Sequence, residues 1–170
     1  MSFWRLYYHF TWSTKNRLPL ISDEIQDKLY SYLIGKAIEV GAHIYAINGM
    51  NDHVHLVAAI PPALAIAIFV KELKGASSHY VNYSLCPGYK FVWQRGYGVL
   101  SIGEKQKHAA MKYVELQQEH HSHQTSIPWL EYVADTMEGP SDRTVEIGGG
   151  LKRSVREPIQ LYKLDMESPF

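Results

Sequence analysis

A pair of apolar runs in the first half of the chain constrains the fold more than any other feature. Residues 42–47 (AHIYAI) and 53–60 (HVHLVAAI) have the apolar and β-branched composition of strands. The polar turn 48–52 separates them. Pro61 and Pro62 stop the second run, because proline cannot donate a hydrogen bond to a strand ladder. The pattern predicts an antiparallel hairpin.

Helical and strand-like segments surround this hairpin. Ser22 can cap a helix whose apolar spacing ends at Gly41. The other expected elements are a strand at 4–12, a helix at 63–83, extended segments at 90–94 and 97–101, and a helix at 104–121. The order β-α-β-β-α-β-α predicts an α+β fold of the ferredoxin-like (RRM-like) type. We expect an antiparallel sheet with the hairpin strands in its middle and helices on one face.

The sequence pattern weakens after Pro128. Turn-forming residues 139–141 and three glycines at 148–150 interrupt this part of the chain, although residues 144–147 remain strand-like. We therefore expect one domain over residues 1–130 and a C-terminal extension of unknown role over residues 131–170.

Charge and composition restrict the function. The chain carries 17 basic and 17 acidic residues, which argues against a protein that coats DNA. Residues 1–130 hold 12 Lys and Arg against 9 Asp and Glu, which is compatible with a local nucleic-acid groove. Without a long apolar run or a secretion signal, and with Cys86 as the single cysteine, we expect a cytoplasmic protein with no membrane partner.

Two histidines in the hairpin are candidate metal ligands. His53 and His55 are two residues apart on an expected strand, so their side chains point to the same face. Neutral imidazoles bind divalent ions well. The alternative is a solvent-facing histidine pair on an ordinary strand, and the spacing alone does not decide between the two.

The last expected helix offers a third ligand and a nucleophile. Tyr113, Gln117 and His121 recur every four residues and share one helix face. A metal ion could polarise a phosphate ester while the Tyr113 hydroxyl attacks phosphorus. Alternatively, Tyr113 is one half-buried aromatic among 12 tyrosines, and His120, His121 and His123 form a polar helix end. Without a Cys-x-x-Cys or His-Glu-x-x-His motif, mixed ligands favour Mg²⁺ or Mn²⁺ over structural zinc.

Several basic and hydroxyl side chains could contact phosphates. Those we select are Lys15, Arg17, Lys71, Lys74, Ser77 and Arg95. Arg95 lies between Trp93 and Tyr97, an interleaving of basic and aromatic residues that is typical of single-strand binders. Each of these side chains could instead belong to a solvated helix end or to a strand end that packs on the core.

Residues 50–57 (MNDHVHLV) resemble the histidine-hydrophobe-histidine (HUH) motif of the single-tyrosine transposases. This family includes small insertion-sequence transposases and REP-associated tyrosine transposases. Further segments are similar to family signatures in the same order, over roughly residues 3–123. They are 8–9 with 14–17, 71–78, 93–97 with 101–103, and 113–121.

The resemblance implies a specific chemistry. His53, His55 and Gln117 would bind Mg²⁺ or Mn²⁺. Tyr113 would cleave single-stranded DNA, hold a 5′-phosphotyrosine and free a 3′-hydroxyl, and the reverse step would rejoin strands without ATP. Hairpin recognition and a homodimer, in which the tyrosine helix often completes the partner's site, are also implied. The cleavage residues are all present, whereas the neutral charge and the extension depart from the family pattern.

Other functions remain open at this point. One is a non-catalytic module that binds single-stranded nucleic acid on the same sheet. Another is a domesticated nickase that no longer mobilises DNA. A third is a small metal enzyme, such as a phosphodiesterase, that would tolerate loss of Tyr113 but not of His53 or His55.

Overall fold

The computed structural model describes residues 3–128, 130–131, 133, 144–147 and 151–154. The chain divides into two compact units, residues 1–137 and residues 138–170. Each unit is described by itself.

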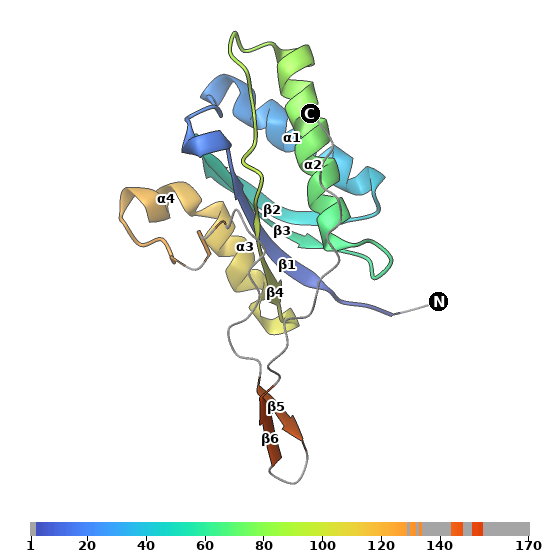
Figure 1. Ribbon diagram of the computed structural model, residues 1–170. Helices are drawn as coiled ribbons and strands as arrows, with labels where there is room; N and C mark the ends of the chain where they lie inside the picture. The colour runs from blue at the N-terminus through green and yellow to red at the C-terminus, as the bar shows by residue number, and fades with distance from the viewer. Residues whose placement is uncertain (1–2, 129, 132, 134–143, 148–150, 155–170) are drawn as a thin grey trace. The chain divides into compact units, whose positions relative to one another are not determined.

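The first unit is built on a four-stranded antiparallel sheet (Figure 1). Its strands are β1 (Tyr7–Ser13), β2 (His43–Met50), β3 (His53–Ala59) and β4 (Gly98–Ile102), in the order β2-β3-β1-β4. The ferredoxin-like α+β fold is therefore confirmed. The expectation that both hairpin strands lie in the middle is wrong for β2, which forms an edge. The centre is β3 and β1, because β1 pairs with both β3 and β4.

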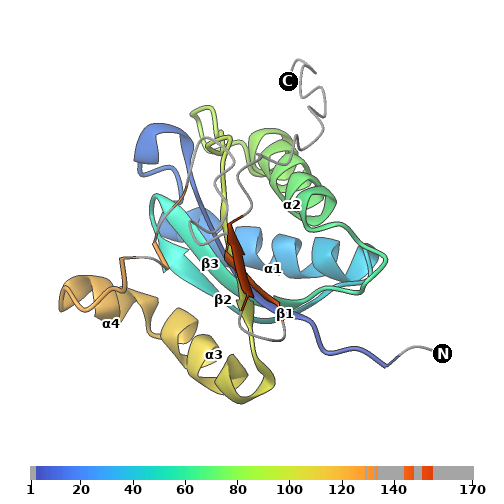
Figure 2. The ribbon, with the colours of Figure 1, turned by 60° about the horizontal axis from the view of Figure 1, so that its bottom comes forward.

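Two helices cover one face of this sheet (Figure 2). They are α1 (Asp23–Glu39) and α2 (Ile66–Tyr80), and a short π-helical turn, η2 (Val81–Leu85), follows α2. Phe10 and Trp12 of β1 and Leu56 of β3 are fully buried in the core beneath them. This core keeps the strands in one register and leaves the opposite face available for other residues.

A third helix, α3 (Lys107–Glu115), packs on the opposite face, where its Val114 joins Ala46 and Val57 in a second core. The expectation of helices on one face therefore holds for α1 and α2 and fails for α3. All seven residues of β3 are buried, so both faces of the sheet need a cover.

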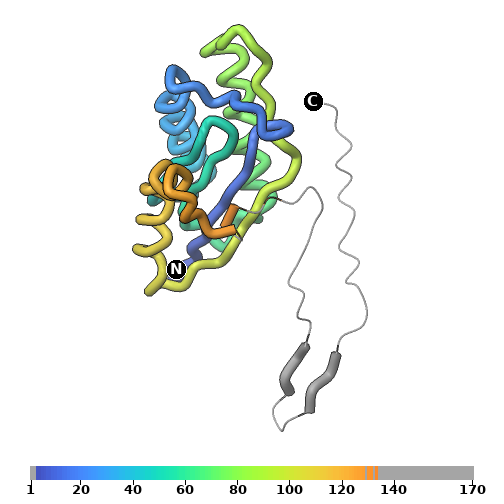
Figure 3. Tube along the Cα trace, turned by 90° about the vertical axis from the view of Figure 1, so that its left-hand side faces the viewer, coloured from blue at the N-terminus to red at the C-terminus, as the bar shows by residue number. Residues whose placement is uncertain are grey.

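The expected helix over 104–121 is interrupted. It consists of the 3₁₀ turn η3 (Glu104–Gln106), α3, and the short helix α4 (Gln117–Ser122). Leu116 separates α3 from α4 with φ −92° and ψ 17°. The 3₁₀ helix η1 (Lys15–Arg17) joins β1 to the segment before α1. Figure 3 shows the chain turning back toward the sheet after α4.

The described part of the second unit is a two-stranded antiparallel sheet of β5 (Thr144–Ile147) and β6 (Leu151–Ser154). The first of these strands is where the sequence indicated one. None of the helices that the structure describes combines the length and the apolar character that crossing a bilayer requires.

Candidate active site

His53 and His55 lie side by side on β3 and are buried, with exposures of 2% and 0%. Their neighbours Val54 and Leu56 point into the core under α1 and α2. By strand alternation both histidines point to the face that α3 covers. Their ring centroids are 5.0 Å apart. The alternative of a solvent-facing histidine pair is therefore wrong.

The Nδ1 atom of each of the two histidine rings has a polar partner. Nδ1 of His53 donates to the carboxylate of Asp52 at 2.5 Å, and Arg17 pairs with the same carboxylate at 3.3 Å. Nδ1 of His55 lies 3.1 Å from Nε2 of His9, a buried residue of β1. Such partners fix the rings of metal-binding histidines and turn the other nitrogen toward the ion. Sequence reasoning missed Asp52 as a partner, although its position directly before His53 was a usable signal.

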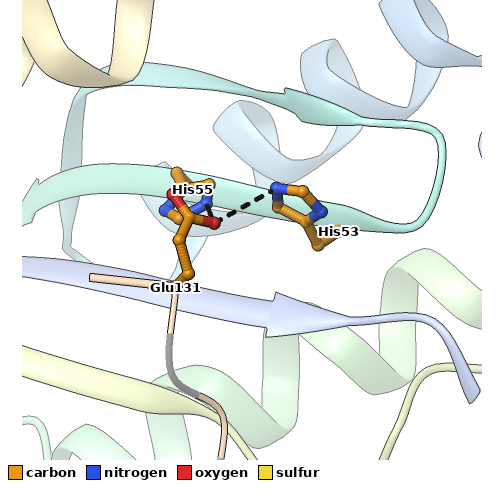
Figure 4. Close-up of side chains that lie close together, drawn as sticks. All are labelled: His53, His55 and Glu131. Carbon is orange, nitrogen blue, oxygen red and sulfur yellow. Dashed lines mark hydrogen bonds and ion pairs between the residues drawn. The ribbon is translucent and has the colours of Figure 1, made fainter. Parts of the chain in front are cut away.

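The carboxylate of Glu131 faces the Nε2 atoms of both histidines (Figure 4). Oε2 of Glu131 lies 3.0 Å from Nε2 of His55 and 3.5 Å from Nε2 of His53. Sequence reasoning placed Glu131 in the extension of unknown role and did not select it. The available signal was a single carboxylate in the apolar stretch 127–133 (IPWLEYV).

The structure brings Tyr113 and Gln117 to the same point. The Tyr113 hydroxyl donates to Oε1 of Glu131 at 2.7 Å and accepts from the backbone N–H of Ile127 at 3.0 Å. Nε2 of Gln117 donates to the same Oε1 at 2.7 Å and lies 3.2 Å from Nε2 of His55. Gln117 is fully buried, so its amide serves this cluster and not the solvent.

His121 completes the cluster. Its ring centroid lies 4.9 Å from that of His53, and its Nε2 is 3.6 Å from Oε2 of Glu131. The reading of His121 as part of a polar helix end is therefore incomplete, because the turn after α3 brings the ring back over the sheet.

The ligand atoms of His53, His55 and Glu131 lie within 4.8 Å of one another. Three buried atoms beside them lack a hydrogen-bond partner: Nε2 of His53, Oε1 of Gln117 and Nε2 of His121. The 3.5 Å between His53 and Glu131 is too long for a good hydrogen bond. Buried polar atoms are rarely left without a partner, and this set of imidazole, amide and carboxylate atoms could hold a divalent cation.

Burial sets the protonation states around the cluster. It lowers the pKa of His9 to about 3 and also lowers the pKa of His55, so both rings are neutral near pH 7. Burial raises the pKa of Tyr113 to about 12, so the phenol keeps its proton. Burial alone would raise the pKa of Glu131, but hydrogen bonds from His55, Tyr113 and Gln117 hold it well below its ordinary value.

The candidate phosphate contacts fall into two groups. Lys15, Arg17, Lys71 and Arg95 are exposed. Arg17 lies beside the cluster, where it also donates to the backbone carbonyl of Glu131 at 3.3 Å. These four side chains are accessible from solvent.

The other two candidates, Lys74 and Ser77, have internal partners in place of a phosphate. Nζ of Lys74 donates to three backbone carbonyls, those of Gln94, Arg95 and Gly96, at 2.5, 3.0 and 2.8 Å. Burial lowers the pKa of Lys74 to about 8. Ser77 is fully buried and accepts from the indole N–H of Trp93 at 2.9 Å. Both side chains hold the segment that precedes β4 against α2.

Comparison with known sequences identifies related proteins. The family model described as "Transposase IS200 like" matches residues 2–117. The ISDra2 transposase TnpA of Deinococcus radiodurans is 33% identical over 119 residues, which cover 67% of this chain and 85% of that protein. The transposase of insertion sequence element IS200 from Salmonella typhimurium is 28% identical over 134 residues, 74% of this chain and 87% of that protein.

Solved structures show the same fold. A protein of D. radiodurans R1 assigned as a transposase superposes with a TM-score of 0.56 at 32% identity, over 68% of this chain and 93% of its own. A REP-associated tyrosine transposase bound to a REP hairpin superposes with a TM-score of 0.51 at 20% identity, over 72% and 74%. The family match ends at Gln117, so Glu131 lies beyond it.

Proposed function

The chain belongs to the family of IS200-like transposases, and from this premise we propose that it cleaves and rejoins single-stranded DNA through a phosphotyrosine intermediate. Family membership supports DNA transposition as the general activity. One observation carries the finer mechanism: the Tyr113 hydroxyl and the Nε2 atoms of His53 and His55 face the same carboxylate. This arrangement supports a mechanism in which a nucleophile and a set of metal ligands would act on one phosphate group.

In the proposed reaction the Tyr113 oxygen attacks a backbone phosphorus. The new bond joins the tyrosine oxygen to the 5′-phosphate, and the bond to the 3′-oxygen breaks. The phenol proton is lost and the departing 3′-oxygen gains a proton, so the step is balanced. The product phosphodiester resembles the one that was cut, and the reverse reaction rejoins strands without ATP. Because the pKa of Tyr113 is raised to about 12, the phenol needs a nearby acceptor for its proton as it attacks.

His53, His55 and Gln117 would hold the divalent cation, Mg²⁺ or Mn²⁺. When bound, such a cation would polarise the scissile phosphate as a Lewis acid. The fit rests on the neutral imidazoles and on the unpartnered Nε2 of His53 and Oε1 of Gln117. His9 and Asp52 would orient the two rings from behind.

We propose hairpin-bearing single-stranded DNA as the substrate, in keeping with the REP hairpin in the related solved structure. Lys15, Arg17, Lys71 and Arg95 would contact its phosphates, while Lys74 and Ser77 would act indirectly by supporting the segment that carries Arg95. We also propose that residues 1–130 form the transposase domain and that the protein is cytoplasmic. The protein would act as a homodimer. Within one subunit Tyr113 lies beside its own His55, with ring centroids 6.4 Å apart, which favours cleavage at the subunit's own metal site.

The test is a covalent protein–DNA adduct. The wild-type protein is incubated with Mn²⁺ and an oligonucleotide that carries a hairpin, and the adduct is resolved on a denaturing gel and mapped by mass spectrometry. We expect the DNA on Tyr113 and no adduct from Tyr113→Phe. Tyr83→Phe is the matched control, because Tyr83 is 74% exposed and distant in sequence from the cluster.

Two outcomes would contradict the proposal. An adduct that persists in Tyr113→Phe would show that another residue is the nucleophile. Hairpin binding without any adduct, unaffected by EDTA, would instead show a non-catalytic binding module.

A further inference from the structure

We propose that Glu131 is a fourth protein ligand of the divalent cation, through Oε2, and positions the Tyr113 hydroxyl through Oε1. The inference rests on the proposed function, and it adds a residue 14 positions beyond Gln117, outside the part of the chain that the family model matches. The carboxylate would then link the metal site to the nucleophile.

The Nε2 atom of His53 and the carboxylate of Glu131 are placed to hold a cation between them. The ionised carboxylate of Asp52 can only accept, so Nδ1 of His53 is a donor, and in the neutral ring Nε2 carries a lone pair. That lone pair faces Oε2 of Glu131 at 3.5 Å. At His55 the 3.0 Å contact with the same oxygen is a hydrogen bond when Nε2 carries the proton, and it calls for a cation only in the tautomer whose Nδ1 donates to His9. A divalent cation between these atoms converts a repulsive arrangement into a coordinated one.

The charge of Glu131 receives hydrogen bonds, but among the described residues no lysine or arginine pairs with it. Its side chain is only 14% exposed. Within the described ranges, Arg17 reaches only the backbone carbonyl of Glu131, and the ion-pair partners of the carboxylate are histidines alone. A buried carboxylate is costly unless a positive charge accompanies it. A divalent cation between Oε2 of Glu131 and the Nε2 atoms of His53 and His55 would supply that charge.

Local structure holds the carboxylate in this place. The backbone N–H of Leu130 donates to the carbonyl of Ile127 at 2.9 Å, and the Ile127 N–H donates to the Tyr113 hydroxyl. Arg17 fixes the carbonyl of Glu131 from the other side. Ile127 is therefore tied to the nucleophile itself, and the Glu131 side chain faces His53 and His55 (Figure 4).

The inference is tested by Mn²⁺ binding to the full-length, metal-free protein without DNA. Free Mn²⁺ is followed by electron paramagnetic resonance for the wild type, Glu131→Gln, His55→Ala and the matched control Glu119→Gln. Glu119 lies on α4 and is exposed. We expect at least about a tenfold weaker Mn²⁺ affinity for Glu131→Gln, because even outer partners of a metal site change affinity by this factor. The control should bind like the wild type, and thermal melts verify folding.

The outcomes separate the two proposals. Unchanged or tighter Mn²⁺ binding by Glu131→Gln, with binding lost in His55→Ala, would overturn the role of Glu131 and leave the transposase mechanism standing. No Mn²⁺ binding by the wild type would overturn the metal role of Glu131 as well. The phosphotyrosine mechanism itself fails only if the Tyr113 adduct is missing or persists in Tyr113→Phe.

Discussion

The hydroxyl of Tyr113 donates a hydrogen bond to the carboxylate of Glu131, with 2.7 Å between the two oxygens. The two residues lie 18 positions apart, on α3 and on the segment after α4. This bond orients the phenol toward β3, where the two histidines turn their Nε2 atoms inward. In the proposed mechanism, the position of the nucleophile and the donor set of the metal site would therefore depend on one shared side chain.

The partner of His53 should influence metal affinity without touching the metal. In Asp52→Ala, Nδ1 of His53 loses its acceptor, and the ring loses its fixed orientation. We expect Mn²⁺ affinity to fall about 10- to 100-fold. Isothermal titration calorimetry measures the effect, with Asp27→Ala on the exposed side of α1 as the control. Equal affinities for Asp52→Ala and the wild type would refute an orienting role.

Lys74 should act on stability. In Lys74→Met three backbone carbonyls lose their shared hydrogen-bond donor, and removing one partner of such a bond costs about 1–3 kcal/mol. We expect the free energy of unfolding in urea to drop by this amount. Lys71→Met is the control, because Lys71 lies on the same helix and is exposed. If Lys74→Met is as stable as the control, Lys74 does not stabilise the segment that precedes β4.

The metal-free protein should lose stability in mild acid. Burial lowers the pKa of His9 to about 3 from 6.5, so between these values the unfolded chain binds a proton that the folded chain does not. His55 acts with the same sign. The stabilisation is complete above pH 6.5 and declines as the pH falls, by at most about 1.4 kcal/mol per pH unit for each proton.

This pH dependence is measured by urea unfolding between about pH 5 and 6.5, a window that lies above the ordinary titration range of carboxylates. His9→Gln removes one titrating group and should flatten the slope. A wild-type stability that does not vary across this window would contradict neutral, buried histidines.

The exposed cations should govern DNA affinity. Lys15→Ala and Arg95→Ala, made in the Tyr113→Phe protein to prevent cleavage, should weaken binding of a single-stranded hairpin oligonucleotide. Each lost phosphate contact should reduce the slope of log K against log salt by about 0.7. Fluorescence anisotropy at several salt concentrations measures both effects, with exposed Lys28 on α1 as the control position. If Lys15→Ala and Arg95→Ala show the same salt slope as Lys28→Ala, these two side chains do not contact the DNA.

The sequence by itself determined the order of the main strands and helices, although not the breaks in the expected helix over 104–121. The apolar run over residues 53–60 and the helical spacing after Ser22 are local patterns, and together with the other segments they predicted the hairpin and the ferredoxin-like order. The two-residue spacing of His53 and His55 is also local, because a strand points such residues to one face. The same holds for the four-residue spacing of Tyr113 and Gln117, which meet at the cluster despite the break at Leu116.

Only the tertiary structure decided which side chains complete the site. His55 and Glu131 are 76 residues apart, and no local period relates them. Lys74 shows the same limit: a lysine on a helix resembles a phosphate ligand in sequence, but three carbonyls from another segment already occupy its ammonium. Burial and pairing depend on which distant segments meet, and hence on the packing of the whole first unit.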